Sequence, residues 1–157
     1  GNPAEGLVTK MEHETSVVKV IAHLPDSAIG DYISSITIDG SNDFTTTRTW
    51  GYVSKRLTYN GKCIAPGGGP SNRLRVNFNV GHRDGLSGDL ITSNTFTAYI
   101  GCILLRMQEG GTWTVTVTCW KSDNSAYEDY TATVRFPEEK EFEFGKLYTV
   151  EVNVEKE

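Results

Sequence analysis

Few residue groups in this chain have the identity and spacing that catalysis requires. His82-Arg83-Asp84 has the residue types of a kinase catalytic loop, but no glycine-rich loop precedes a lysine-bearing strand and no helix is predicted to carry a partner glutamate. The glycines at 67–69 stand between prolines and lack the Gly-Lys-Ser/Thr ending of a phosphate loop. Serine and threonine are abundant, and no serine is marked as the nucleophile of a Ser-His-acid triad. The sequence therefore favours a protein that is not an enzyme.

Metal-ligating residues are equally scattered. The three histidines, none with a helical i, i+4 partner, are His13, His23 and His82. Asp84 and Asp89 share a polar stretch, but the regular series of Asp and Asn oxygens that a calcium loop needs is missing. We expect neither a metal site nor a cofactor.

The three cysteines, Cys63, Cys102 and Cys119, have no CxxC spacing and are too few for a disulfide scaffold. They fit small buried hydrophobic residues. A second interpretation stays open: if Gly110-Gly111 forms a two-residue hairpin turn, Cys102 lies opposite Cys119 and a cross-strand disulfide is conceivable.

Exposed aromatic rings are the better candidates for a binding function, because β-sandwich modules hold sugars by stacking flat rings on them. Four aromatic residues are predicted at strand ends or in loops: Trp50, Tyr52, Trp120 and Tyr127. The alternative is that these rings close the ends of a sandwich core.

Charge is distributed unevenly along the chain, whose net charge is −5. The stretch from Phe44 to Arg83 holds seven cations and no carboxylate: Arg48, Lys55, Arg56, Lys62, Arg73, Arg75 and Arg83. Either these cations complement carboxylates on adjacent strands, or they form a basic face for an anionic polymer or an acidic partner. Nucleic acid is a poor candidate because the chain is acidic overall and contains no known reading module. The possible ligand-binding set is Trp50, Tyr52, Arg73, Arg75 and Trp120.

Period-two alternation defines the elements that must position these residues. The clearest strand is 146–154, where Tyr148, Val150, Val152 and Val154 share one face. Its predecessor, 130–136, ends at Pro137, which has no ladder donor. Further strands are predicted over 16–24, 32–39, 44–50, 52–59, 62–65, 73–80, 95–107 and 112–120. Asn60-Gly61 predicts a type I′ hairpin turn, and 81–89 a polar loop.

These elements predict an all-β protein, an antiparallel β-sandwich of about eight strands. The chain has 157 residues, which suits one domain over 15–157, preceded by a flexible polar tether over 1–14. The apolar character of 95–107 on both faces indicates a central strand. The strand 16–24 also carries apolar residues on both faces, as a strand that is exchanged between subunits requires.

The C-terminal strands resemble those of fimbrillin-like surface proteins over about 25 residues. The shared pattern is Tyr130-x-Ala132-x-Val134-x-Phe136, a charged turn, and a strand that begins with the kernel Gly145-Lys146-Leu147-Tyr148-Thr149-Val150. The resemblance implies a transthyretin-like, Greek-key sandwich that is exported to the cell surface or outer membrane. It also implies a lipid anchor or signal upstream of residue 1, and partners among other surface or pilus subunits that bind by strand addition.

Two features favour a single-domain relative of that family. The connection 25–31 after the first strand contains neither Arg nor Lys, so a trypsin-like protease has no target there, and the chain has room for one domain only. The expected function is therefore non-enzymatic cell-surface adhesion or a fimbria-related structural role. A carbohydrate-binding module of an exported surface system is the alternative.

Overall fold

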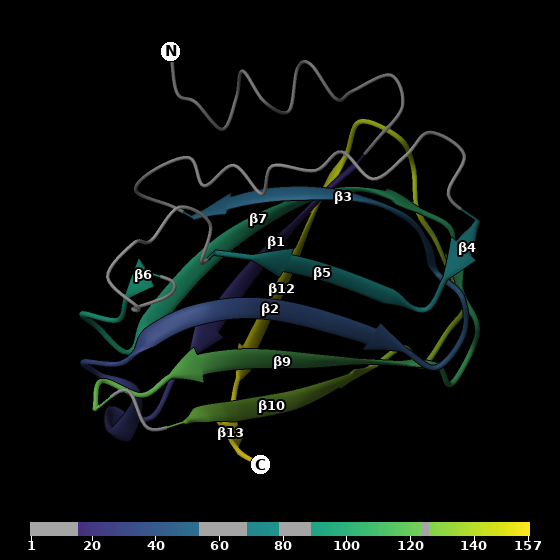
Figure 1. Ribbon diagram of the computed structural model, residues 1–157. Coiled ribbons are helices and arrows are strands. Elements are labelled where there is room, and N and C mark those ends of the chain that lie inside the picture. The colour runs from purple at the N-terminus through teal and green to yellow at the C-terminus, as the bar shows by residue number, and fades with distance from the viewer. Residues whose placement is uncertain (1–15, 54–68, 79–88, 124–125) are drawn as a thin grey trace.

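The computed structural model describes residues 16–53, 69–78, 89–123 and 126–157, with only the backbone described for 47–53 and 89. These residues form an all-β sandwich in which two sheets pack face to face, as the alternation predicts (Figure 1). The one helical turn among them is the three-residue 3₁₀ helix η1 (Asp26–Ala28). No helix in the described ranges is long and apolar enough to cross a membrane.

The first sheet, sheet A, has the strand order β12-β1-β7-β3-β4. Its strands are β1 (Ser16–His23), β3 (Thr45–Val53), β4 (Pro70–Ser71), β7 (Thr95–Leu104) and β12 (Leu147–Asn153). The central position of β7, between β1 and β3, confirms the prediction from its two apolar faces.

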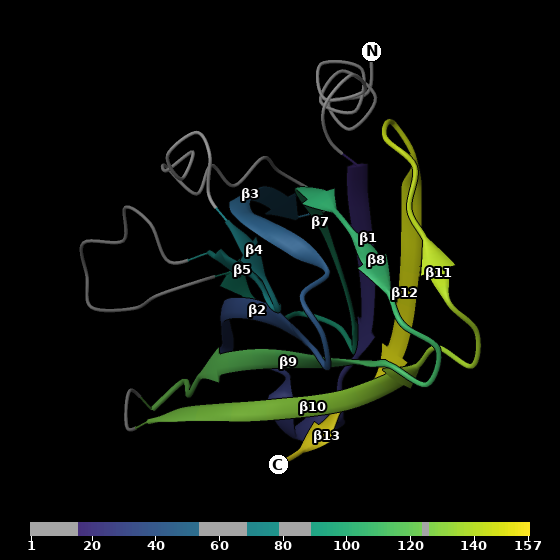
Figure 2. The same cartoon turned by 90° about the vertical axis from the view of Figure 1, so that its right-hand side faces the viewer.

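The second sheet, sheet B, has the order β13-β10-β9-β2-β5, and β6 also pairs with β2. Its strands are β2 (Tyr32–Gly40), β5 (Arg73–Asn77), β6 (Asp89–Leu90), β9 (Thr112–Trp120), β10 (Tyr127–Arg135) and β13 (Glu155–Lys156). A separate two-residue ladder joins β8 (Arg106–Met107) to β11 (Lys140–Glu141). Figure 2 shows the two layers from the side, with β9 and β10 in one and β1 and β12 in the other.

The core follows the period-two pattern of the strands. The inward residues of β1 (Val18, Val20 and Ala22) and of β9 (Trp113, Val115, Val117 and Cys119) are all buried. Those of β12 and β10 join the same cluster, with Val150, Val152 and Tyr130 buried and Val134 and Tyr148 partly buried. In β9, β10 and β12 the residues between them are partly or fully exposed, whereas in β1 Val17 on the outer side is buried as well.

The first strand lies inside its sheet. β1 pairs antiparallel with β7 on one side and parallel with β12 on the other, with Val20 opposite both Ala98 and Val150. The β1–β12 pair is a parallel exception to the antiparallel sandwich that the sequence predicts. A parallel pair needs a long crossover connection. Here the two strands lie near opposite ends of the described chain, so most of the other strands lie between them in the sequence.

The hairpin at Gly110-Gly111, on which the disulfide interpretation depended, does not pair 95–107 with 112–120. β7 belongs to sheet A and β9 to sheet B. The strand is interrupted at Leu105, whose backbone N–H donates to the carbonyl of Phe44 (2.6 Å), and the chain then crosses between the sheets. Gly110 still supplies a positive φ (76°) at the turn that enters β9.

The two described cysteines are therefore not cross-strand partners. Cys102 faces Ser16 and Thr49 in sheet A, and Cys119 faces Ile33 and Glu128 in sheet B. Both thiols are free and fully buried, which agrees with the interpretation as small hydrophobic residues.

Several predicted features fall outside the described residues. They are the tether 1–14, the Asn60-Gly61 hairpin, Cys63, the end of the predicted strand 73–80 after Phe78, and the loop up to residue 88 with His82 and Asp84.

Burial predicts that neither described thiol reacts in the native protein. Burial raises the pKa of Cys102 far above its usual value, and burial together with the nearby Asp31 carboxylate raises the pKa of Cys119 to about 12. In a Cys63→Ser variant we expect no reaction with a thiol-specific dye at pH 8 until denaturant unfolds the chain, and two reactive thiols afterwards. Rapid labelling of the folded variant would contradict the assigned burial.

Candidate functional site

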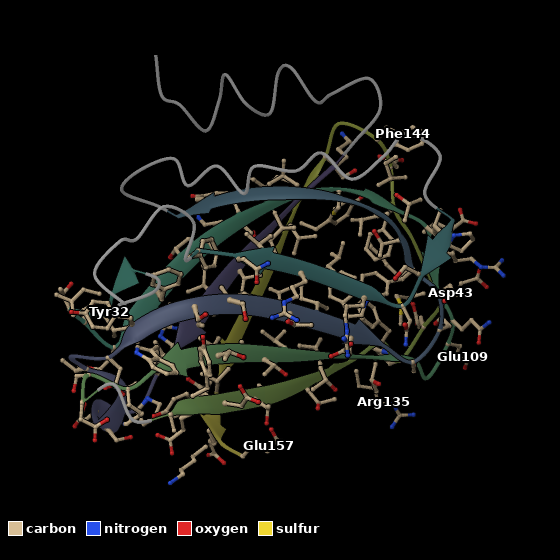
Figure 3. The ribbon with its side chains drawn as sticks, in the orientation of Figure 1. Tyr32, Asp43, Glu109, Arg135, Phe144 and Glu157 are labelled. Carbon is tan, nitrogen blue, oxygen red and sulfur yellow. The ribbon has the colours of Figure 1, made fainter. Side chains whose placement is uncertain are left out.

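A row of large apolar side chains crosses the outer face of sheet B at one end. Tyr127 of β10 lies opposite Trp120 of β9, Trp120 opposite Tyr32 of β2, and Tyr32 opposite Leu90 of β6. Tyr127 and Leu90 are 54% and 51% exposed, and Trp120 and Tyr32 are half-buried. We call these three aromatic residues, together with Leu90, the aromatic row; Tyr32 marks its position in Figure 3.

Two rings of the row, those of Trp120 and Tyr127, meet edge to face. The ring centroids of Trp120 and Tyr127 are 4.3 Å apart and their planes are inclined by 61°. This inclination means that the two rings do not form one flat platform. The arrangement suits stacking of one sugar-sized ring at a time better than binding of a wide planar surface.

Threonines cover the outer face of sheet B beyond the aromatic row. They are Thr37, Thr114, Thr116, Thr118, Thr131 and Thr133. Thr118 Oγ1 donates to Asp129 Oδ1 at 2.7 Å, and the hydroxyls of Thr114 and Thr133 lie 3.3 Å apart. The aromatic row therefore lies beside a surface of threonine hydroxyls. These groups can donate and accept hydrogen bonds, as the hydroxyls of a carbohydrate require.

A cluster of charged residues fixes the strand ends that carry the rings. Asp31, Lys121 and Glu128 adjoin Tyr32, Trp120 and Tyr127 in the sequence. Lys121 Nζ lies 2.8 Å from Asp31 Oδ2 and 3.2 Å from Glu128 Oε2. Lys156 of β13 adds a contact to Glu128 Oε1 at 2.8 Å. We call these four residues the charged cluster.

Asp31 is the most buried member of the charged cluster. Its side chain is only 4% exposed, and its Oδ1 also accepts a hydrogen bond from the backbone N–H of Ser122 at 2.9 Å. Because a buried carboxylate needs such partners, Asp31 ties the beginning of β2 to the residues that follow β9. Tyr32 and Trp120 are thereby held as neighbours.

The pKa values of the cluster reflect these contacts. Hydrogen bonds to Asp31 and Glu128 raise the pKa of Lys121, although burial opposes the shift. Hydrogen bonds from Lys156 and Lys121 lower the pKa of Glu128. The cluster is therefore a set of mutually satisfied charges, and its role here is to position the strand ends.

The predicted ligand-binding residues belong to strands of both sheets. Trp50 and Tyr52 belong to β3 in sheet A, opposite Gly101 and Tyr99, and their side chains lie outside the described part. Trp120, Arg73 and Arg75 belong to sheet B. The five residues are therefore divided between the two sheets, and whether they form one site stays a prediction.

The two arginines share the outer face of sheet B with Trp120 but lie away from it. Arg75 is in line with Thr37 and Thr116, and Thr116 is four residues, or roughly 13 Å, from Trp120 along β9. Arg73 lies further along and pairs with Asp39, with Nε 2.7 Å from Oδ1. This pair agrees with the interpretation that neighbouring strands neutralise the basic segment.

Sequence reasoning missed Tyr32 and Leu90. Their membership in the row depends on the register of β2 with β9 and of β6 with β2, including an irregularity between Ile33 and Ser35. Tyr127 was recognised as a strand-end aromatic. The short connection between β9 and β10 places Tyr127 opposite Trp120, and this connection is the one feature of the sequence from which that pair could have been predicted.

No group of three or more potential metal ligands occurs among the residues that the structure describes. Comparison with known proteins adds no family: no family model matches the sequence, and no curated protein does. The resemblance to fimbrillin-like proteins therefore depends on the C-terminal strands alone.

The charged cluster predicts a pH-dependent contribution of Glu128 to stability. The pKa of Glu128 is lower in the folded state than its usual value of 4.5, so its contribution is fully present above that pH and is lost as the pH falls through the folded-state pKa. We expect Glu128→Gln to lower the thermal midpoint at pH 7 and to have little effect near pH 2.

The matched control is Glu138→Gln, which removes an exposed carboxylate that has no partner among the described residues. It is expected to leave the midpoint unchanged at both pH values. A Glu128→Gln deficit of equal size at both pH values would rule out an ion-pair contribution.

Proposed function

We propose that this protein is a non-enzymatic cell-surface module with a role in adhesion or in a fimbria-like assembly. The observation that carries the proposal is the position of β1. It is the first strand of the described chain, yet it fills an interior slot of sheet A between β7 and β12. A strand donated by another subunit could bind in the same slot through both ladders.

The side chains of β1 suit this role. Val18, Val20 and Ala22 are completely buried in the core, and Val17 on the opposite side is 2% exposed. Each fully buried valine contributes roughly 1.5–3 kcal/mol, so an empty slot would be strongly unfavourable. Strand addition would therefore be driven by the same burial that holds β1 in place.

The fimbrillin-like resemblance of the C-terminal strands supports the same proposal, since β12 is the strand that borders the slot. Under this proposal the protein is exported to the cell surface or outer membrane, and its partners are other surface or pilus subunits. Its transthyretin-like topology and an anchor upstream of residue 1 belong to the same proposal.

The aromatic row favours a second candidate function, that of a carbohydrate-binding module. Its exposed and half-exposed rings lie beside a threonine-covered face, and sugars combine apolar ring faces with hydroxyls. The two functions are compatible, because the aromatic row is on sheet B and the slot is in sheet A.

Strand exchange can be tested in the folded chain. A recognition sequence for a site-specific protease, inserted between Ile29 and Gly30, allows the connection after β1 to be cut once the protein has folded. We expect a labelled peptide of residues 16–24 to replace β1 slowly, and we expect cut protein to form oligomers on size exclusion. The same peptide with Val20→Asp should not be incorporated, because it would bury an unpaired carboxylate.

The control peptide carries Lys19→Gln, a change at a side chain that points away from the core, and should exchange like the parent peptide. If no peptide enters the cut protein and the cut protein stays monomeric, assembly through this slot is excluded.

Glycan binding can be tested on an array. Removal of the ring in Trp120→Ala or Tyr127→Ala should weaken binding to a glycan hit about tenfold, which corresponds to a stacking contribution of about 1.4 kcal/mol. Binding to anionic glycans should weaken further as the salt concentration rises.

Phe144→Ala is the matched control, since Phe144 is 61% exposed but lies far from Tyr32 in Figure 3. Equal losses for Trp120→Ala and Phe144→Ala, or an array without any hit, would count against carbohydrate recognition by the row.

A further inference from the structure

β12 is the outer strand of sheet A, and only one of its two sides is paired. Among the described strands it pairs with β1 alone, and it stands at the edge of the sheet beyond β1 in Figure 2. Tyrosine, threonine and valine make up four of its seven residues, and it contains no proline. An unpaired strand edge of this kind is a template on which another extended chain can form a ladder.

The hydrogen bonds at the two ends of the β1–β12 ladder show which backbone groups of β12 face β1. The C=O of Lys146 accepts from the N–H of Val17 at 3.0 Å, and the N–H of Val154 donates to the C=O of His23 at 3.0 Å. Because backbone groups alternate in direction along a strand, the even-numbered residues of β12 point to β1 and the odd-numbered residues point to the free edge. The odd-numbered residues, with which no described strand pairs, are Leu147, Thr149, Glu151 and Asn153.

A hollow of about 340 Å³ lies beside the middle of this edge. Thr149, Val150 and Glu151 line it on the β12 side, and its other walls include Val134 and the ring of Phe142. Thr149 and Glu151 are residues whose backbone groups point to the free edge, so an extended chain that pairs with them lies along the hollow. A side chain opposite Val150 points to the same face of the sheet as Val150, and therefore into the hollow.

The connection that forms the far wall of the hollow is fixed to the core. The ring of Phe142 stacks on Trp113 at 5.6 Å with an angle of 10°, and the backbone N–H of Glu143 donates to the hydroxyl of Tyr148 at 2.7 Å. The hollow is therefore formed before a chain binds, which lowers the cost of binding.

Carboxylates outnumber cations around this edge. The connection 137–146 between β10 and β12 carries four glutamates and two lysines, and Glu151 stands on β12 itself. Glu141 and Glu143 of this connection are exposed and have no ion-pair partner among the described residues. A chain that approaches the edge therefore meets net negative charge, which favours cationic side chains on the partner.

We propose that the free edge of β12 binds an extended, cationic peptide segment of another protein, with an apolar side chain opposite Val150 and a lysine or arginine opposite Glu151. The free backbone groups supply the ladder, which is antiparallel because such pairs are the more stable, and the hollow selects the apolar side chain. β1 stays in place when this edge is occupied. The proposal therefore does not depend on strand exchange at β1 or on glycan binding.

A capped peptide of sequence Thr-Val-Lys-Phe-Thr-Val-Lys tests the proposal, since its phenylalanine can lie opposite Val150 while the preceding lysine lies opposite Glu151. Hydrogen exchange of the full chain is followed by NMR. In the free protein the amide hydrogens of Thr149 and Glu151 should exchange rapidly, whereas those of Val150 and Val152 are protected by β1. At a peptide concentration about ten times its dissociation constant, exchange at Thr149 and Glu151 should slow about tenfold.

Two methylated peptides separate backbone pairing from non-specific adhesion. Methylation of the backbone nitrogens of the first lysine and of the threonine after phenylalanine removes the two N–H groups that face β12, and should abolish binding. Methylation of the phenylalanine nitrogen, whose N–H points away from β12, is the matched control and should leave binding unchanged.

Variants of β12 repeat the test from the side of the protein. Thr149→Pro removes an N–H that points to the free edge and leaves the ladder with β1 complete, so it should abolish peptide binding. Thr149→Val keeps the N–H and should bind like the parent protein. If Thr149→Pro does not fold, the methylated peptides decide.

The proposal is overturned if the parent peptide leaves exchange at Thr149 and Glu151 unchanged up to its solubility limit. It is also overturned if the doubly methylated peptide binds as well as the parent peptide. Protection of the two amides that rises with protein concentration in the absence of peptide would assign the edge to a second copy of this chain instead.

Discussion

The pairing of the first strand with the last long one is the constraint on which the rest of the structure depends. β12 is the edge of sheet A and its ladder is with β1, so β12 is attached to the sheet through β1. β1 in turn pairs with β7, and its inward valines occupy the middle of the core. Without β1, the sheet would lose β12 as well as the burial of Val18 and Val20.

This constraint also has a kinetic side. Contacts between β1 and β12 join residues that are more than a hundred positions apart, with Val17 opposite Leu147. Such non-local pairing slows folding, because the chain pays the loop-closure entropy before the contacts form. A slot that is completed late is also one in which a strand from another molecule can compete, which connects the topology to the proposed assembly.

The sequence predicts which way side chains point far better than it predicts which strands pair. Alternation identified the inward residues of β12, and the same period of two holds in β1, β9 and β10, since it is a local property of the sequence. The interpretation of Gly110-Gly111 as a hairpin turn was wrong, because alternation predicts which face a side chain points to but not which strand is its neighbour. The chain leaves sheet A at Leu105, whose N–H donates to the carbonyl of Phe44, and no local pattern predicts a contact between residues so far apart in the sequence.

The candidate site shows the same limit: single residues can be predicted from the sequence, but their grouping cannot. Trp120 was found because a tryptophan at a strand end is conspicuous, but Trp50 and Tyr52 were grouped with it although they lie in the other sheet. The aromatic row depends on the register across four strands. It cannot be assembled from the sequence without the pairings.

The hairpin of β9 and β10 carries one aromatic group at each end, on opposite faces. Trp120 lies on the outer face at the end of β9, and Trp113 lies on the inner face seven residues earlier, about 24 Å away along the strand. Trp113 is surrounded by core residues, whereas the exposed side of Trp120 contributes little to burial. Changes at Trp120 should therefore leave the fold intact, while changes at Trp113 act on the core. This difference is why exposed aromatic residues can be used to probe the outer face without disturbing the fold.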